Sequence, residues 1–271
     1  MSRLNEIIAV INNKGGVGKT TTVQSIAACL LRLNKKLRIL LIDLDPQGNL
    51  SLLMGWGSAQ KTGDRTIYDA LKSGGASVPV YKTSTGLYYS PSSPFLQTVD
   101  ADLYRAMQPK MVLGACFGEQ LDDHTGDGLA NIVEDFDYVF IDCPPALSEC
   151  TYNAMAVATG LLVPVQMEGL SVNGLGTIMV ELGRVQKALN KGLELRGLLP
   201  VMVDARPKIV KEFIDYLHES FGDNVCKTMI RRCVKINEAH TRLQDIYSWA
   251  PYCTAAIDYE MLVKELFDKK K

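Results

Sequence analysis

Short apolar runs alternate with longer amphipathic segments along most of the chain. The runs at residues 7–11, 38–42, 138–141, 161–165 and 198–203 are rich in Val, Ile and Leu, which predicts buried strands. Apolar positions recur every three or four residues at 21–33, 172–190 and 209–221, which predicts helices. Strands that are apolar on both faces are typical of a parallel sheet covered by helices on both sides. The pattern therefore predicts an α/β, doubly wound fold with a mostly parallel sheet and helices on both faces.

The segment between residues 55 and 137 is less regular than its flanks. It contains a Pro-Ser-Ser-Pro turn at 91–94 and a polar stretch at 122–127. Apolar residues at 87–89 and 111–116 predict ordinary elements joined by turns within this segment. No biased linker and no internal repeat divides the sequence at this point.

Composition narrows the class of protein. The chain has 271 residues and is 47% hydrophobic, so residues 1–271 are expected to form a single domain with one full core. The formal net charge is −1, so any contact with nucleic acid must come from a local basic patch. The seven cysteines are expected to be reduced thiols of a cytoplasmic protein, because no C-x-x-C pair occurs. No leader pattern precedes residue 7, and no apolar run reaches the ~20 residues that cross a bilayer.

A glycine-rich loop follows the first predicted strand and opens the first predicted helix. Its glycines allow consecutive N–H groups to converge on phosphate oxygens, and the helix N-terminus adds a positive dipole end. Lys19 is then placed to reach the β- and γ-phosphates of a nucleotide, and the Thr20 hydroxyl to bind Mg²⁺. The general motif G-x-x-x-x-G-K-[ST] has glycine where this chain has Asn13. The expected nucleotide-binding residues are Lys14, Gly15, Gly16, Val17, Gly18, Lys19, Thr20 and Thr21.

Two further predicted strands end in carboxylates. Asp142 follows the strand at 138–141, and a carboxylate at the end of a buried strand is costly unless a cation or water meets it. Asp43 and Asp45 end the strand at 38–42, and either of them could cap the helix that follows. In the functional interpretation, Asp45 orients or deprotonates the attacking water. The expected metal-binding residues are Thr20, Asp45 and Asp142.

Four motifs spread over nearly the whole chain support a resemblance to a known family. They read K-G-G-V-G-K-T-T-T at 14–22, D-L-D-P-Q-G-N at 43–49, F-I-D-C-P-P at 140–145 and R-R-C-V-K-I-N-E-A at 231–239. Together they resemble the ParA/MinD family of deviant Walker-A P-loop ATPases, and most of all its ParA (Soj-like) branch. The closing segment at 255–266 resembles the last helix of that family.

The resemblance implies a mechanism. ATP and Mg²⁺ would clamp two protomers into a homodimer, with Lys14 of each reaching the phosphates of the other. A water positioned by Asp45 would then end the dimer by hydrolysis, so the expected catalytic residues are Lys14, Lys19 and Asp45. Family members hydrolyse ATP slowly alone and faster with a ParB-like centromere-binding protein. The ATP-bound dimer binds double-stranded DNA without sequence preference, which implies a role at the nucleoid in plasmid or chromosome segregation.

Two short basic clusters are candidates for the DNA contacts. The alternative is a solvated surface of mixed charge, because Asp204, Glu212, Asp215 and Glu238 are interspersed. No helix-turn-helix segment precedes the first strand, so an N-terminal operator-reading domain is not expected. The candidate DNA-binding residues are Arg206, Lys208, Arg231, Arg232 and Lys235, with Lys211 nearby.

Other functions from the same superfamily remain as alternatives. A MinD-like membrane-associated ATPase would carry an extra amphipathic helix, whereas this sequence stops at residues 267–271 without one. An iron–sulfur protein would use Cys116 and Cys150, one before and one after the Asp142 strand. A GTPase would have a lysine two positions before Asp204, and this chain has none there. A nucleotide switch that positions a protein cargo with negligible turnover is the non-enzymatic alternative.

Overall fold

An eight-stranded sheet crosses the centre of the computed structural model, which describes residues 6–57, 63–74, 77–118, 122–123, 135–167, 171–204, 206 and 208–268. The strands are β1 (Glu6–Val10), β2 (Ile39–Asp43), β3 (Pro79–Lys82), β4 (Tyr88–Ser90), β5 (Asp122–Asp123), β6 (Tyr138–Asp142), β7 (Gly160–Gln166) and β8 (Glu194–Val201). Their order across the sheet is β5-β3-β4-β2-β6-β1-β7-β8. β3 and β4 pair antiparallel, and the other neighbours pair in parallel. The mostly parallel sheet is confirmed.

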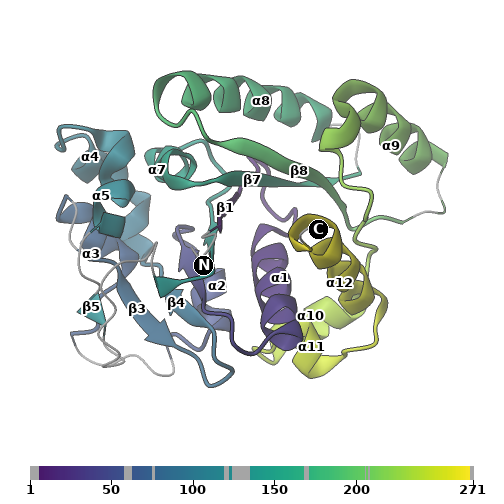
Figure 1. Ribbon diagram of the computed structural model, residues 1–271, viewed down its shortest axis with the longest axis horizontal. Helices are drawn as coiled ribbons and strands as arrows, with labels where there is room; N and C mark the ends of the chain where they lie inside the picture. The colour runs from purple at the N-terminus through teal and green to yellow at the C-terminus, as the bar shows by residue number, and fades with distance from the viewer. Residues whose placement is uncertain are drawn as a thin grey trace.

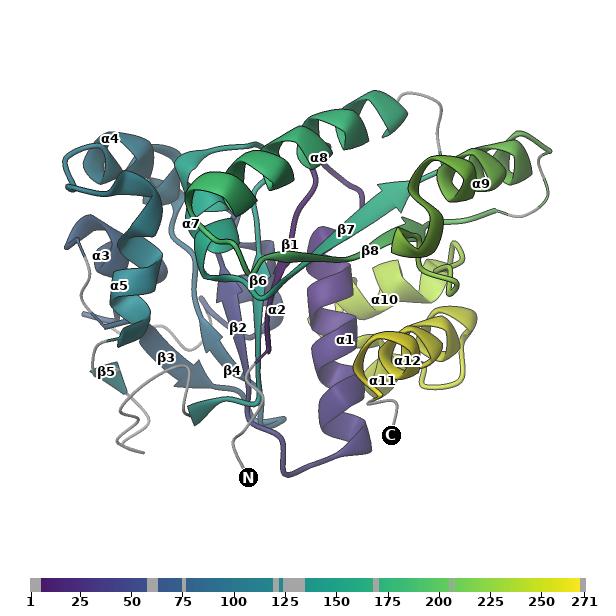
Figure 2. The ribbon, with the colours of Figure 1, turned by 45° about the horizontal axis from the view of Figure 1, so that its top comes forward.

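Helices cover both faces of this sheet (Figure 1). Figure 2 shows α7, α8 and α9 on one side, and α1 with α10, α11 and α12 on the other. The helices are α1 (Lys19–Leu33), α2 (Asn49–Leu53), α3 (Ile67–Lys72), α4 (Val99–Leu103), α5 (Val112–Gly118), α7 (Glu149–Val157), α8 (Ser171–Ala188), α9 (Lys208–Phe221), α10 (Val234–Thr241), α11 (Ile246–Trp249) and α12 (Thr254–Phe267). The described residues also form short 3₁₀ turns at η1 (Pro94–Gln97), η2 (Pro109–Met111) and η3 (Gly222–Asn224). The doubly wound fold is therefore confirmed.

Alternate residues of the central strands enter two different apolar cores. In β1, Ile7 and Ala9 belong to the core that contains residues of α7 and α8. Ile8 and Val10 belong to the core that contains residues of α1 and α12. Burial on both faces explains why these strands are continuous apolar runs in the sequence. Within the described residues, none of the helices has the combined length and apolar character that spanning a bilayer requires.

Most predicted boundaries agree with the structure, and two stretches differ. The apolar residues 88–89 and 112–116 lie in β4 and α5, with Leu87 just before β4 and Met111 in η2. The polar loop predicted at 122–127 is wrong at its start, because Asp122 and Asp123 pair with β3 as β5, and residues 124–127 lie outside the described part.

The strand predicted at 198–203 is β8, which begins earlier, at Glu194, and ends at Val201, because Met202 adopts a left-handed backbone with φ 54°. Val203 then forms an isolated bridge with Arg231, and the chain leaves the sheet edge.

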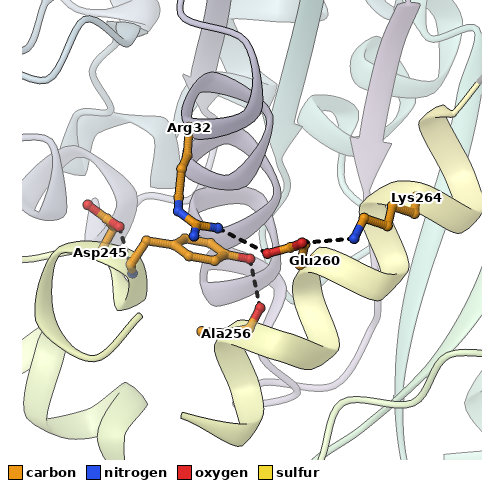
Figure 3. A network of polar contacts seen from close by, with 6 residues as sticks. Arg32, Asp245, Ala256, Glu260 and Lys264 are labelled. Carbon is orange, nitrogen blue, oxygen red and sulfur yellow. Dashed lines mark hydrogen bonds and ion pairs between the residues drawn. The ribbon is translucent and has the colours of Figure 1, made fainter. Parts of the chain in front are cut away.

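The C-terminal end of α1 is fixed by α11 and α12 (Figure 3). Arg32 Nη1 lies 3.0 Å from Glu260 Oε2, and Lys264 Nζ lies 2.8 Å from Glu260 Oε1. The Arg32 guanidinium also lies over the Tyr247 ring, and the Tyr247 hydroxyl donates to the Ala256 carbonyl at 3.0 Å. Exposed ion pairs of this kind contribute only about 0–1 kcal/mol each. Their main effect is to orient α1, whose other end faces the glycine-rich loop.

Gly197 of β8 lies against Cys226 without room for a side chain. A Cβ atom added at Gly197 would lie 2.5 Å from Cys226 Sγ, and Cys226 is buried. We expect Gly197→Ala to lower the free energy of unfolding by about 1–3 kcal/mol through overpacking. Urea denaturation of the purified variant measures this change.

Two variants control this experiment. Nothing lies within 4 Å of a Cβ added at Gly183 in α8, so Gly183→Ala should leave stability unchanged or raise it by up to ~1 kcal/mol. Adding Cys226→Ala to Gly197→Ala removes the clashing sulfur and should restore part of the loss. If the stability lost by the double variant equals the sum of the losses of Gly197→Ala and Cys226→Ala measured separately, the clash between the two positions is contradicted.

Candidate nucleotide site

The loop between β1 and α1 presents backbone N–H groups toward a cavity. Gly16 and Gly18 have φ values of 75° and 81°, a conformation that residues with a side chain rarely adopt. Gly18 is the N-cap of α1, and the Thr22 N–H makes the first helical bond, to the Gly18 carbonyl. The N–H groups before Thr22 precede the helical ladder, so they can donate to an anion at this helix N-terminus.

The front of the loop is held by asparagine side chains. Asn12 Nδ2 donates to the Pro164 carbonyl of β7 at 2.7 Å, and Asn12 Oδ1 accepts from the Lys14 N–H at 2.9 Å. Asn13 lies against α8, since a Cβ added at Gly174 would meet Asn13 Oδ1 at 2.7 Å. The residue that departs from the general motif therefore contacts a neighbouring helix, while Asn12 fixes the loop to the sheet.

The two lysines of the loop lie in different environments. Lys19 is buried, and its Nζ donates to the Lys14 carbonyl at 3.3 Å. Burial lowers the pKa of Lys19, while the nearby carboxylates of Asp142 and Asp45 act in the opposite direction. Lys14 Nζ lies 3.4 Å from Gln166 Oε1 at the end of β7. Lys19 therefore lies within the loop, and Lys14 contacts the adjacent strand end.

The register of the sheet brings two carboxylates together at its carboxyl edge. Asp142 of β6 pairs with Val10 of β1 on one side and with Asp43 of β2 on the other. Thr20 Oγ1 donates to Asp142 Oδ2 at 2.6 Å. Asp142 Oδ1 is buried without a hydrogen-bond partner among the described residues. Burial, with the neighbouring Asp43 charge, raises the pKa of Asp142 well above its usual range.

The carboxylates of Asp43 and Asp45 differ in their hydrogen-bond partners and in their position relative to the cavity. Asp43 Oδ2 accepts from the Ser51 N–H at 2.8 Å and from the Ser51 hydroxyl at 2.6 Å, so Asp43 caps the first turn of α2. Burial raises the pKa of Asp43 to about 7. Asp45 Oδ1 accepts from the Gln47 N–H at 2.9 Å, and Asp45 also lines the cavity in front of the loop. The capping alternative therefore applies to Asp43 and leaves Asp45 at the cavity.

Two adjoining cavities meet at the loop. The first, of about 460 Å³, is lined by Gly15, Gly16, Gly18, Lys19, Thr20, Thr21, Asp45, Gln47, Asn49, Leu52, Leu53, Pro145, Met202, His240 and Leu243. The second, of about 320 Å³, is lined by Gly18, Thr21, Val201, Met202, Ile230, Arg231, Arg232, Cys233, Val234, Ile236, Asn237 and Tyr259. Gly18, Thr21 and Met202 line both, so the two cavities adjoin at the start of α1.

Several cavity residues were not predicted from sequence. Gln47 and Asn49 lie within a motif that sequence analysis does single out, so a signal for them existed. Met202, His240 and Leu243 come from distant segments without any motif for nucleotide contact. Met202 and Leu243 do share one property, since they are the described non-glycine residues with positive φ, at 54° and 53°. Left-handed backbone at non-glycine residues often marks functional sites.

The donor set at the sheet edge fits a hard divalent cation. Thr20 offers a hydroxyl, and the buried oxygen Asp142 Oδ1 offers a full acceptor position beside it. Oxygen donors of this kind suit Mg²⁺, which retains several water ligands and binds through one or two protein groups plus phosphate. The Val17 side chain, which has no oxygen donor, is buried, so Val17 contributes only its backbone to the loop. The residues present therefore fit a magnesium ion at Thr20 and Asp142.

The first basic cluster is partly neutralised. Arg206 forms an ion pair with Asp204, and hydrogen bonds from Arg206 lower the pKa of Asp204 to about 2. Arg232 is exposed and lies near enough to Asp204 to lower that pKa further. The Lys208 side chain lies outside the described part, and Lys211 is exposed on α9. Arg206 and Arg232 therefore share one surface region.

The second basic cluster divides into different environments. Arg231 Nη2 lies 2.6 Å from Asp258 Oδ1, and Asp258 is buried. Lys235 Nζ lies 2.8 Å from Glu238 Oε2. Arg231 therefore anchors its segment to α12. Arg232, which lies between Arg231 and Lys235 in the sequence, is exposed to solvent.

The thiols considered for an iron–sulfur cluster lie in the core. Cys116 and Cys150 are buried at 0% and 2% exposure. Burial raises the pKa of Cys150 to about 12, which disfavours the thiolate that binds metal. A cluster shared between two protomers requires thiolates at the surface, so the geometry of these residues favours structural thiols.

Known proteins share this chain's sequence and fold. The family model described as an AAA domain matches residues 5–195. The chain is 32% identical over 265 residues to sporulation initiation inhibitor protein Soj of Bacillus subtilis, covering 97% of this chain and 98% of the relative. It is 36% identical over 259 residues to chromosome-partitioning ATPase Soj of Thermus thermophilus, covering 96% and 94%.

A solved structure has the same fold. Cobyrinic acid a,c-diamide synthase from Mycobacterium smegmatis, with bound ADP and magnesium, has a TM-score of 0.77 to this chain. The two are 28% identical, and the match covers 96% of this chain and 93% of that one. With its loop, paired strand-end carboxylates and full-length relatives, the chain belongs to the ParA/MinD family of P-loop ATPases, in the branch of the Soj and ParA partition proteins.

Proposed function

We propose that this chain is a slow ATP hydrolase that drives the segregation of a plasmid or chromosome. The observation that carries the proposal is the arrangement of Lys19, Thr20 and Asp142 around the α1 N-terminus. Open amides and an ammonium group suit a polyphosphate, and the unpartnered Asp142 oxygen suits the magnesium ion that accompanies it. The full-length similarity to Soj and ParA proteins supports the same function.

The two cavities divide the nucleotide between them. The triphosphate occupies the first cavity, against the loop amides and Lys19. The base occupies the second cavity, whose lining includes the apolar residues Met202 and Ile230. Met202 stands where a guanine-reading protein would have a lysine, two residues before Asp204, so adenine is favoured.

Thr20 and Asp142 would hold a magnesium ion, which would supply positive charge to neutralise the charge that develops on the phosphates. Asp45 lines the phosphate cavity, close enough to Lys19 to oppose the burial that lowers the Lys19 pKa, and orients the attacking water or accepts its proton. Lys14 leaves Gln166 when a second protomer docks and contacts the phosphates of that partner, which supplies positive charge in the manner of an arginine finger. Turnover alone is slow because this charge and the water position depend on the dimer.

The ATP-bound dimer binds double-stranded DNA without sequence preference at the nucleoid. Arg206 and Arg232 supply the exposed charge, and dimerisation doubles the number of phosphate contacts. A ParB-like centromere-binding protein accelerates hydrolysis and so releases the DNA. Measuring phosphate release with ATP alone, with duplex DNA and with DNA plus such a partner tests this scheme. Release that never exceeds the no-protein background would reject the hydrolase.

Thr20→Ala tests the magnesium site. The substitution removes the hydroxyl that donates to Asp142, so we expect Mg²⁺-dependent ATP affinity to fall by about 10- to 100-fold. Calorimetric titration with ATP in magnesium and in EDTA should show nearly equal affinities in the variant. Thr20→Ser retains the hydroxyl and should bind as the original protein does. A large magnesium effect that survives in Thr20→Ala would place the ion elsewhere.

Asp45→Ala tests the position of the attacking water. We expect phosphate release to fall by about 10²- to 10⁴-fold while ATP still binds, because a positioned general base contributes that range. The variant should accumulate as an ATP-bound dimer in light-scattering measurements. Asp223→Ala, in the exposed turn η3, is the matched control and should hydrolyse normally. Normal turnover in Asp45→Ala would exclude this role.

Arg232→Ala tests the DNA surface. Each phosphate contact adds about 0.9 to the slope of log affinity against log salt concentration, so losing one per protomer should reduce that slope. Fluorescence anisotropy with random duplex DNA at several salt concentrations measures the change in the presence of ATP. Arg105→Ala, beyond α4 at the other end of the sheet, is the control (Figure 1). Equal slopes for both variants would remove Arg232 from the interface.

A further inference from the structure

Two of the seven cysteines differ from the rest in exposure and in position. Cys233 and Cys253 are half-buried, whereas the other five are buried. Cys233 is the N-cap of α10, and Cys253 is the N-cap of α12. Two accessible thiols therefore occupy the starts of two helices that lie on the same face of the sheet (Figure 2).

Hydrogen bonds connect the chain just before Cys233, and also helix α11, to helix α12. The Arg231 N–H donates to Asp258 Oδ2 at 2.9 Å, and the Arg231 guanidinium donates to both oxygens of that carboxylate. The Tyr247 hydroxyl of α11 donates to the Ala256 carbonyl in the first turn of α12 (Figure 3). The Arg231 contacts fix the residues just before Cys233 against α12, and the Tyr247 contact fixes α11 against the start of α12, close to Cys253.

The Cys233 sulfur lies where two helix N-termini converge. It faces the backbone N–H groups of Lys235 and Ala255, the Thr254 hydroxyl and the Cys253 thiol. Burial opposes ionisation, but these hydrogen bonds outweigh it and lower the pKa of Cys233 below the usual range of a thiol. Burial raises the pKa of Cys253. Cys233 therefore forms the nucleophilic thiolate more readily, whereas Cys253 stays protonated.

We propose that Cys233 and Cys253 form a reversible disulfide when the protein meets hydrogen peroxide. The Cys233 thiolate attacks one peroxide oxygen and breaks the O–O bond, which leaves a sulfenic acid and a hydroxide that takes up the thiol's proton to become water. The Cys253 sulfur then attacks the Cys233 sulfur, and the departing hydroxyl takes the Cys253 proton as a second water. Two thiols and one peroxide become one disulfide and two waters. Exchange with a dithiol reverses the reaction.

The disulfide would act on the nucleotide site. Cys233 lines the 320 Å³ cavity, and α10 also carries His240, which lines the 460 Å³ cavity. A covalent bond to α12 holds this wall in one position and restricts its adjustment around a ligand. Oxidation therefore lowers nucleotide affinity. This consequence rests on the proposed function, whereas the disulfide itself does not.

Mass spectrometry of the full-length protein tests the disulfide. After peroxide treatment and alkylation, we expect a non-reduced peptide linking Cys233 to Cys253 that dithiothreitol removes. Cys253→Ser should leave a sulfenic acid at Cys233 that dimedone captures, and Cys233→Ser should give no adduct at residue 253. Thr254→Val retains both thiols but loses one hydrogen-bond donor, so Cys233 should react severalfold more slowly.

The unaltered protein also tests the proposal without any variant. Competitive alkylation near neutral pH should label Cys233 before Cys253. Free thiols at both positions after peroxide, a linkage to another cysteine, or faster labelling of Cys253 would overturn the proposal.

Nucleotide titration separates the disulfide from its consequence. A fluorescent ATP analogue should bind the oxidised protein at least about threefold more weakly than the reduced protein, with recovery after dithiothreitol and no change in Cys253→Ser. Equal affinity in both states would reject the coupling. A protein that forms the disulfide but binds no nucleotide when reduced would instead reject the proposed function and leave the thiol pair in place.

Discussion

Two carboxylates buried side by side at the carboxyl edge of a parallel sheet are the constraint on which the rest of the site depends. Asp43 and Asp142 pair in register across β2 and β6, and each is about 1% exposed. Burying an uncompensated carboxylate costs several kcal/mol. Asp43 is stabilised by donors from Ser51 and from the Asp45 backbone, whereas within the described part of the chain Asp142 has a donor from Thr20 and a second oxygen without a partner. The second carboxylate is therefore the one whose surroundings fit the proposed cation.

Two residues that line the nucleotide cavity have strained backbone conformations. Met202 and Leu243 have left-handed conformations that cost roughly 1–2 kcal/mol each for residues with side chains, and both line the first cavity. The turn at Met202 ends β8 and lets Val203 pair with Arg231. Strain at this point therefore positions the wall shared by the two cavities.

The sequence could predict the sheet and the loop because their signals are local. Strands buried on both faces need continuous apolar runs, and a phosphate loop needs glycines and a lysine at fixed spacing. It could not decide whether Asp43 or Asp45 caps α2, because that depends on where Ser51 lies in space. Nor could it separate Arg231 from Arg232, since the carboxylate that holds Arg231 belongs to α12. Contacts between distant segments thus determine the roles that local patterns leave open.

The four residues from Ile230 to Cys233 include residues of the cavity wall, an exposed arginine and a half-buried thiol. Arg232 is exposed and lies near Asp204, and Arg232 and Cys233 both line the second cavity. Because Arg231 fixes this segment to buried Asp258, a ligand that shifts the cavity wall must move the exposed arginine or strain that ion pair. Nucleotide, DNA-facing charge and thiol chemistry would therefore be coupled through one short stretch of backbone, with no need for a longer path across the sheet.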